Sequence, residues 1–369
     1  MIYLDNGATS FRKPPAVDRA VQEAFSSCAN PGRGGYPAAM EAAKRVFDTR
    51  VQAAKLFHCQ PEQVVFTSNC SHGLNMAIQT LVKPGDRVVI SGFEHNAVTR
   101  PLTALEAQIT VAGRQLFDWG DTLTAFQKAL KEGADAAVFT HASNVFGYVL
   151  PAAELAALCK AYEVPFIIDA AQSAGVQDID FEALGADFIA MPGHKGLLGP
   201  QGTGLLLCNR MPEPLIRGGT GTDSINQRMP DYLPEGAEAG TLNVPGIAGL
   251  GAGLQYLNRW GLKAIRQAET IEARRCAEGL KKMGFTVFSG PHQGGTVSFL
   301  PEGECEEAAE YFAARGIALR AGLHCAPLAH KSAGTLETGT VRLSFGHDAA
   351  PWQTERFLAA AKGLAHRGS

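Results

Sequence analysis

The sequence predicts an α/β fold, in which a large domain built on a mainly parallel sheet is followed by a smaller α+β domain. Short runs of Val, Ile and Phe alternate with helical patterns, the runs are continuously apolar, and the pattern changes after about residue 260. Continuous apolar runs separated by helices are typical of parallel strands covered on both faces. We expect a large domain over residues 16–255, and a small domain that joins residues 256–369 to the N-terminal arm, residues 1–15.

The expected large domain follows a strand-then-helix order, with one strand of the sheet running in reverse. Its last two strands flank a loop rich in Gly and Pro, which indicates that they are neighbours. The predicted strands are 64–66, 87–91, 136–140, 165–168, 188–190 and 203–207, and the predicted helices are 73–81 and 152–162.

The expected small domain opens with a long helix and then mixes short strands with helices. This order differs from the regular alternation that precedes it, which is why we separate the two parts. The predicted helices are 263–283, 306–315 and 351–365, and the predicted strands are 286–288, 296–299, 317–320 and 340–344.

Composition excludes several classes of protein. The 369 residues include 33 Lys and Arg against 36 Asp and Glu, a net charge of −3, whereas a general nucleic-acid binder carries a strong basic excess. A hydrophobic share of 46% with 19% charged residues excludes a disordered chain. The sequence has no apolar run of about 18 residues and no basic segment followed by an apolar one at its start, so we expect neither a membrane span nor a secretory signal.

The cysteines are dispersed, and none forms a CxxC pair or stands at the spacing of a zinc site. We therefore expect no metal centre. Unpaired cysteines of this kind fit the reducing cytoplasm better than a disulfide framework. The eight cysteines are at positions 28, 59, 70, 159, 208, 276, 305 and 325.

Two charged residues follow predicted strands. Lys195 is the only formally charged residue between Asp187 and Arg210, in a Gly- and Pro-rich loop between apolar strands. A lysine is usually a surface residue, but burial in such a loop lowers its pKa and suits Schiff-base formation. Asp169 ends a buried strand, at the edge where α/β sheets bind ligands, although an Asp there can also cap a helix. Together they match the protein side of a pyridoxal phosphate (PLP) site.

Two further segments follow predicted strands. Ser71 and His72 begin a helix, whose N-terminus would suit a phosphate, although ordinary capping explains a Ser there equally well. His95 follows the next strand. Such a His is usually a solvated loop residue, but over a cofactor ring it could stack and act as acid or base.

Together these residues resemble fold-type I PLP enzymes of aminotransferase class V, in the cysteine desulfurase branch, and the resemblance runs nearly end to end. The combination of Asp169 and Gln172 with Gly193-His194-Lys195 is specific for class V. The segment around Cys325 is similar to the short catalytic-cysteine loop of second-group desulfurases. The segments that carry the resemblance are 3–9, 94–95, 140–145, 169–172, 193–195, 238–241, 322–326 and 341–344.

The resemblance implies how the cofactor ring is held. Lys195 would bind PLP covalently and move protons at the substrate Cα. Asp169 would keep the pyridine nitrogen protonated, which makes the ring an electron sink. His95 would stack on the ring, while Gln172 and Asn144 would bond its phenolate oxygen.

The resemblance also implies a phosphate site that two subunits share. Ser71, the backbone of His72, and His194 would hold the phosphate, and Thr241 would reach it from the other subunit of a homodimer. Pro192 stands where many relatives carry a phosphate-binding Ser, so one donor is missing. Gly32 and Tyr36 are further departures, because second-group relatives carry histidines there near the substrate entrance.

Substrate and nucleophile follow from the same resemblance. Arg342 would grip the substrate carboxylate, a bidentate task that suits its planar fork, with Ala8 and Asn144 beside it. Read alone, Arg342 could equally be a surface strand residue. Cys325 would be the nucleophile, because it follows His324 in a Gly-, Ala- and Pro-containing loop, whereas we read the other seven cysteines as small core residues.

The function implied is that of a PLP-dependent cysteine desulfurase. It would convert L-cysteine to L-alanine and keep a persulfide on Cys325 for an acceptor protein. The same site could cleave L-selenocysteine. Two alternatives stay open: another class V transamination or epimerisation in which Cys325 is incidental, and a PLP-bound scaffold with little turnover.

Overall fold

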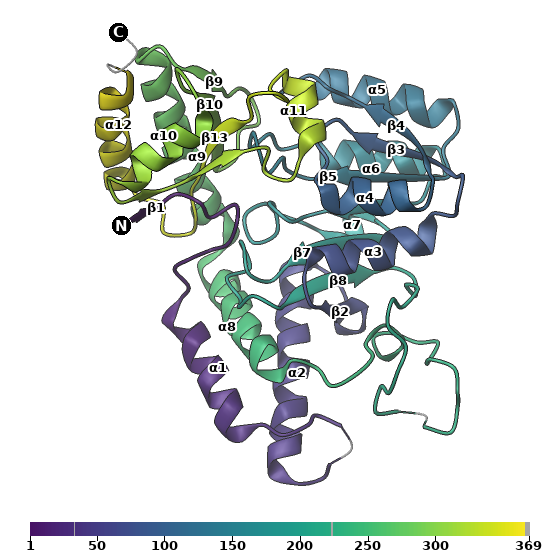
Figure 1. Cartoon of the computed structure of the whole chain (residues 1–369). Coiled ribbons are helices and arrows are strands. Elements are labelled where there is room, and N and C mark those ends of the chain that lie inside the picture. Colours follow the sequence, from purple (N-terminus) through teal and green to yellow (C-terminus); the bar gives the residue numbers. More distant parts are fainter. Residues whose placement is uncertain (33, 223, 366–369) are drawn as a thin grey trace.

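The computed structural model describes residues 1–365 apart from 33 and 223, so residues 366–369 of the predicted small domain lie outside the described residues. It confirms the α/β fold class. Figure 1 shows the large sheet with α3 and α4 against it, and a smaller sheet at upper left with α9, α10 and α12. Within the described part of the chain, no helix is long and apolar enough to cross a membrane.

The large sheet has seven strands in the order β2-β8-β7-β6-β5-β3-β4. Only β8 runs against its neighbours, which confirms the single reversed strand. β4 was not predicted, because its residues alternate between exposed and half-buried at the sheet edge instead of forming a continuous apolar run. The strands are β2 (Val64–Thr67), β3 (Arg87–Ser91), β4 (Gln108–Ala112), β5 (Ala136–Thr140), β6 (Phe166–Asp169), β7 (Phe188–Pro192) and β8 (Gly204–Cys208).

Helices cover both faces of this sheet because its inner strands bury side chains on both. Along β3, Val89 joins the core on one face, and Val88 and Ile90 join the core on the other. α2, α5, α6 and α8 pack on the first face, and α3 and α4 on the second. The helices are α1 (Pro15–Ser27), α2 (Pro37–Phe57), α3 (Cys70–Leu81), α4 (Asn96–Ala104), α5 (Trp119–Lys131), α6 (Ala152–Ala161), α7 (Phe181–Leu184) and α8 (Val244–Trp260).

The smaller sheet is antiparallel, in the order β12-β13-β10-β9, and has its own apolar core. Its strands are β9 (Thr286–Phe288), β10 (Thr296–Leu300), β12 (Arg320–Gly322) and β13 (Thr340–Ser344), and its helices are α9 (Leu262–Lys282), α10 (Cys305–Ala313) and α12 (Pro351–Ala365). α11 (Pro327–Ala333) packs instead on the core of the large sheet through Ala329.

One predicted strand, 317–320, is two strands in the structure. β11 (Ile317–Ala318) pairs in parallel with β1 (Ile2–Tyr3) of the N-terminal arm, whereas β12 pairs with β13. The chain changes partner at Leu319, and an apolar run cannot reveal such a change. The arm is therefore tied to the C-terminal part of the chain, while the division at residue 255 stays a prediction.

The large sheet positions the site through its parallel strands. β3, β5, β6 and β7 run in the same direction, so their carboxyl ends meet at one edge. Polar side chains follow each of these ends. This is the edge at which open α/β sheets bind ligands.

Candidate active site

A cavity of about 120 Å³ opens at this edge, which is where open α/β sheets bind ligands. It brings together most of the predicted cofactor residues, although they are spread over more than a hundred positions. The predicted residues that line it are Ser71, His95, Asn144, Asp169, Gln172, His194 and Lys195, together with the departure Pro192.

Lys195 enters the cavity from a tight loop that follows β7. The loop is closed by hydrogen bonds from Gly193 N to Thr203 O (2.8 Å) and from Gly199 N to Gly193 O (2.7 Å). A Cβ at Gly196 would collide with the carbonyl oxygen of Ala174, so only glycine permits this close packing. Burial lowers the pKa of Lys195, while Asp169 works in the opposite direction. A lysine amine of this kind is a better nucleophile than an exposed one.

Asp169, at the end of β6, is 2% exposed and offers one free oxygen. Its Oδ1 accepts hydrogen bonds from Ala171 N (2.9 Å) and from the Cys70 thiol (3.5 Å). No hydrogen bond from the described residues reaches Oδ2, which leaves that oxygen for a ligand. Burial, reinforced by Asp169, raises the pKa of Cys70 well above its usual value, so the thiol stays a donor. Sequence reasoning missed Cys70, because a cysteine at a helix start carries no distinctive signal.

His95 is the N-cap of α4 and not a solvated loop residue. Its Nδ1 accepts a hydrogen bond from Ala97 N (3.0 Å), which places the proton of the neutral ring on Nε2. Burial lowers the pKa of His95, although the Asp169 carboxylate opposes this. The ring is therefore neutral at physiological pH. It lines the cavity, and its one acceptor, Nδ1, is already bonded to Ala97 N.

The predicted phosphate residues lie at the start of α3 and beside Lys195. The Asn69 side chain caps α3 by accepting from His72 N (2.9 Å), so this N–H already has a partner. Ser71 is exposed at the same helix start, where N–H groups favour anions. His194 Nδ1 contacts Thr9 Oγ1 (3.1 Å), and burial lowers the pKa of His194 to about 4.

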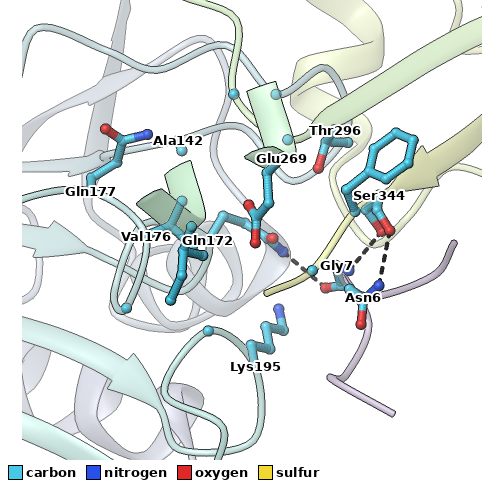
Figure 2. Close-up of a pocket in the computed structure, with 18 of the residues that line it drawn as sticks. Asn6, Gly7, Ala142, Gln172, Val176, Gln177, Lys195, Glu269, Thr296 and Ser344 are labelled. Carbon is cyan, nitrogen blue, oxygen red and sulfur yellow. Dashed lines mark hydrogen bonds between the residues drawn. The ribbon is translucent and has the colours of Figure 1, made fainter. Parts of the chain in front are cut away.

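Gln172 ties the N-terminal arm to this edge of the sheet. Its Nε2 donates to Gly7 O (3.0 Å), a bond that Figure 2 shows beside Lys195. The predicted substrate residue Ala8 lies in the same turn of the arm, with its N–H bonded to Asp5 O (3.0 Å). The arm therefore forms one wall of the site.

Arg342, on β13, is 2% exposed, and its guanidinium bonds two groups. Its Nη2 pairs with Asp5 Oδ1 (2.7 Å), and its Nη1 donates to Asn144 O (3.0 Å). Its Nε is buried without a partner among the described residues. Arg342 is therefore a buried strand residue, unlike the surface reading, and it keeps a donor that a carboxylate could use.

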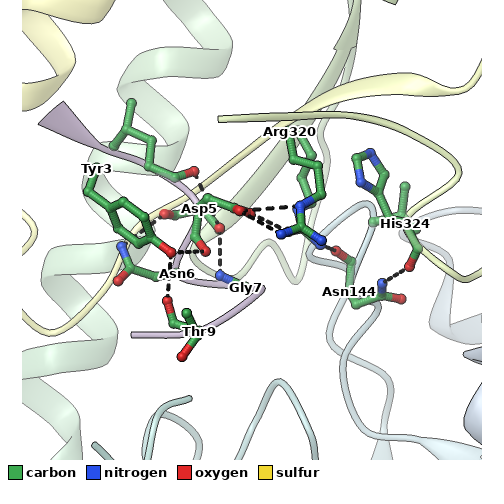
Figure 3. A network of polar contacts seen from close by, with 12 residues as sticks. Tyr3, Asp5, Asn6, Gly7, Thr9, Asn144, Arg320 and His324 are labelled. Atoms are coloured by element: carbon green, nitrogen blue, oxygen red, sulfur yellow. Dashed lines mark hydrogen bonds and ion pairs between the residues drawn. The ribbon is translucent and has the colours of Figure 1, made fainter. Parts of the chain in front are cut away.

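Asp5 is a residue whose role sequence reasoning missed. Arg320 and Arg342 face each other across β12 and β13, and like charges in that position repel. Asp5 lies between them: its Oδ2 pairs with Arg320 Nη2 (3.0 Å) while Oδ1 holds Arg342. Figure 3 shows Asp5 facing Arg320. The only sequence signal was its place in the arm motif.

Cys325 lies outside the cavity lining, exposed on the loop between β12 and α11. His324 and Cys325 both adopt the left-handed conformation, with φ of 48° and 56°. Two hydrogen bonds hold this turn: Asn144 Nδ2 donates to His324 O (2.7 Å; Figure 3), and Asn96 N donates to Cys325 O (2.8 Å). The His324 ring is buried, and its Nε2 bonds Thr340 O (3.1 Å).

Thr241 is one of five predicted site residues outside the cavity lining, together with Ala8, His72, Cys325 and Arg342. It is exposed and lines a separate groove with Thr220 and with the buried ion pair of Arg50 and Glu238. Its role therefore stays a prediction that depends on a second subunit. In the described residues, no cluster of His, Cys, Asp and Glu could hold a metal ion.

Comparison with known proteins places this geometry in a family. The model of the aminotransferase class-V family matches residues 2–357. The chain is 33% identical to a probable cysteine desulfurase of Methanothermobacter thermautotrophicus, over 93% of this chain and 89% of that protein. It is 32% identical to a probable cysteine desulfurase of Pyrococcus abyssi, over 99% and 94%. A solved cysteine desulfurase from Thermococcus onnurineus NA1 superposes with a TM-score of 0.91 at 31% identity, covering 99% of this chain and 95% of that one.

Proposed function

The chain belongs to the aminotransferase class-V family, and we propose that it is a cysteine desulfurase that converts L-cysteine to L-alanine and leaves the sulfur as a persulfide on Cys325. One observation carries the proposal beyond the family. Asn144 joins the carbonyl of the Cys325 loop to Arg342, the buried guanidinium that would hold the substrate carboxylate. The thiol and the substrate anchor thus share one hydrogen-bonded network. The similarity to several proteins named as cysteine desulfurases supports the same reading.

The family uses PLP, and the residues at the strand ends fit it. The cavity combines a buried amine of lowered pKa at Lys195 with a free carboxylate oxygen at Asp169 and the start of α3. These three features would hold the carbonyl carbon, the pyridine nitrogen and the phosphate of PLP, respectively. When bound, PLP would draw electrons from the substrate and make its Cα–H bond acidic.

Each residue then has a task in the reaction. Arg342 Nε and its neighbouring N–H groups would bind the substrate carboxylate. Lys195 Nζ would take the Cα proton, which a lysine of lowered pKa does more readily at neutral pH. Asp169 would keep the pyridine nitrogen charged, and its Oδ1 bonds to Ala171 N and Cys70 would keep Oδ2 aimed at that nitrogen.

Cys325 would complete the reaction. Its thiol loses a proton to solvent, and the thiolate attacks the substrate sulfur, so that an S–S bond forms as the substrate C–S bond breaks. The electron pair of the C–S bond stays with the three-carbon product. That product gains one proton at Cβ and regains one at Cα to become alanine. A thiolate is suited to this step because a serine hydroxyl is barely ionised at neutral pH.

The proposal includes a setting for the enzyme. We propose a homodimer in which Thr241 reaches the partner's phosphate site, with an acceptor protein that collects the sulfur from the exposed Cys325. We keep the division into a large domain over 16–255 and a small domain over 256–369 with the arm. We place the enzyme in the cytoplasm, because its eight cysteines are free and its proposed nucleophile needs a reducing environment.

The test is to incubate the purified, PLP-loaded protein with L-cysteine and a reductant, and to measure alanine and sulfide together. Equal amounts of both products are expected, with nearly all turnover lost in Cys325→Ser. Cys159→Ser is the matched control, because Cys159 is a buried core cysteine that should not affect the chemistry. Equal turnover by wild type and Cys325→Ser would favour another class V reaction, and bound PLP without turnover of any amino acid would favour a scaffold.

A further inference from the structure

A second, narrow cavity of about 60 Å³, room for a few water molecules, shares Lys195 and Gln172 with the cofactor cavity. Its walls come from the N-terminal arm, the loops of the large sheet, α9 and the end of β13. Figure 2 shows the side chains of Lys195 and Glu269 entering it from different sides. The proposed function assigns no task to this space. Its polar lining includes Asn6, Ser143, Gln177, Thr296 and His347.

Glu269, from α9, is the notable residue of this cavity. It is 6% exposed, and no hydrogen bond or ion pair joins it to any described residue. Its carboxyl packs against Gly295, because a Cβ on that glycine would lie only 2.7 Å from Glu269 Oε2. Burying an ionised carboxylate without a partner is costly. Burial raises the pKa of Glu269 to about 8, with a smaller contribution from Asp348, so the group is a neutral acid at physiological pH.

Of the described groups that surround Glu269, only Lys195 remains as a partner for proton exchange. His347 lines the same cavity, and burial lowers its pKa, so it is neutral. Asp348 already pairs with Arg12 at 3.6 Å. Ile265, one turn earlier on α9, forms an apolar wall. A cavity with several polar groups is suited to water, which can link two side chains that do not touch.

The proposed reaction requires a proton from outside the substrate's Cα. Cys325 releases its thiol proton to solvent, whereas the product must be protonated at both Cα and Cβ. Lys195 obtains only one proton from Cα, so the second must be supplied. A proton donor inside the protein, reached without the substrate entrance, would let Lys195 protonate the product at both Cα and Cβ.

We propose that Glu269 is the proton reservoir of Lys195. Its carboxyl gives a proton through cavity water to Lys195 Nζ, and the resulting carboxylate takes a proton back from solvent. No electron moves in this step, and the proton gained by the product balances the one that Cys325 released. Glu269 touches neither substrate nor cofactor; it acts through Lys195. The proposal rests on the proposed function for the identity of the reaction.

The test uses L-cysteine deuterated at Cα, in ordinary water, and measures by mass spectrometry how much deuterium remains in the alanine. In the wild type, Lys195 exchanges with the reservoir and most deuterium is lost. Glu269→Gln should retain several-fold more deuterium, with KM unchanged. It should lower kcat on the order of tenfold, less than the ~10²–10⁴-fold that a direct acid–base group is worth.

Two variants control this experiment. Glu269→Asp keeps the acid and should restore much of the exchange. Glu278→Gln makes the same chemical change at an exposed position on α9 and should behave like the wild type. Equal deuterium retention and equal kcat in the wild type and Glu269→Gln would overturn the proposal.

A second readout does not depend on turnover. In the cofactor-free protein, the infrared difference between wild type and Glu269→Gln should show a protonated carboxyl band that disappears near pH 8. A band already lost at pH 6 would overturn the reservoir, whatever the substrate. If the band titrates as expected but cysteine yields no alanine, the proposed function fails, and the protonated state of Glu269 is still supported.

Discussion

The cofactor cavity and the Cys325 loop are built on contrasting backbones. Lys195, Asp169 and His95 follow the ends of buried strands and are fixed by short backbone bonds around them. Cys325 instead lies on an exposed loop in which two successive residues are left-handed. A left-handed residue other than glycine costs roughly 1–2 kcal/mol, so the turn persists only because neighbouring bonds hold it.

The difference matches what each region would have to do. A cofactor gains from groups that are already in place, because their orientation then costs nothing during the reaction. A thiol that collects sulfur and hands it on must approach the site and then withdraw. Asn144 bonds both the His324 carbonyl and Arg342, so it connects the cofactor cavity's surroundings with the Cys325 loop.

The largest expected effect is at Lys195. Lys195→Ala removes the only amine in the cavity lining among the described residues, so PLP should become removable by dialysis, and turnover should fall by more than about 10³-fold. Absorbance before and after dialysis, with borohydride reduction, measures the covalent link. A reducible adduct in this variant would show that the fixed region is assigned wrongly.

Asp169→Ala should have the second-largest effect on turnover. It removes the carboxylate whose Oδ2 would face the pyridine nitrogen, a type of electrostatic support worth about 2.7–4 kcal/mol in the barrier. Turnover should therefore fall by about 10²–10³-fold while PLP stays bound through Lys195. Cys70→Ala, which removes only the thiol bond to Oδ1, should have a much smaller effect. Equal losses in the two variants would contradict the separate roles of the two oxygens.

Arg342→Lys tests the link between the two regions. It keeps the charge but loses the planar fork that bonds Asp5 and Asn144. KM for L-cysteine should rise about 10–100-fold, because a hydrogen bond to a charged group is worth about 1.5–3 kcal/mol. Arg320→Lys is the control, since Arg320 shares Asp5 but is half exposed. An unchanged KM in Arg342→Lys would contradict the role of Arg342 in binding the substrate carboxylate.

The smallest effect concerns stability near the fixed region. Glu94 is fully buried, and burial raises its pKa to about 8, although the hydrogen bonds it accepts from Ser91 and Thr140 oppose this. An acid with a raised pKa binds more protons when folded, so stability is lost as pH rises from about 4.5 towards 8. Glu94→Gln should reduce this loss by roughly 1–3 kcal/mol. Urea unfolding at pH 5 and at pH 8.5 measures it, and equal pH dependence in both proteins would contradict the burial argument.

Much of the fixed region could be predicted from sequence, because its chemistry is local. Continuous apolar runs identified six of the seven strands, and Lys195 and Asp169 stood out because each follows a buried strand. The edge strand β4 escaped because its residues alternate. The capping role of His95 also escaped, since a histidine is not a common N-cap.

The rest depends on contacts between distant parts of the chain. Asp5 lies between Arg320 and Arg342 only because the arm reaches residues more than 300 positions away. The left-handed turn at His324 and Cys325 contains no glycine to announce it, and its bonds come from Asn96 and Asn144 on other elements. No local pattern encodes such pairs, so the sequence indicated Cys325 through the resemblance and its place after His324 in a loop, and not through these contacts.

The most direct test of the central claim is mass spectrometry of peptides from the protein after a brief treatment with L-cysteine, without reductant. The account predicts the added mass of one sulfur atom on the peptide that contains Cys325, its removal by a reductant, and its absence from Cys325→Ser, which should still bind PLP with an unchanged spectrum. Added sulfur only on another cysteine, or wild-type alanine production by Cys325→Ser, would contradict it.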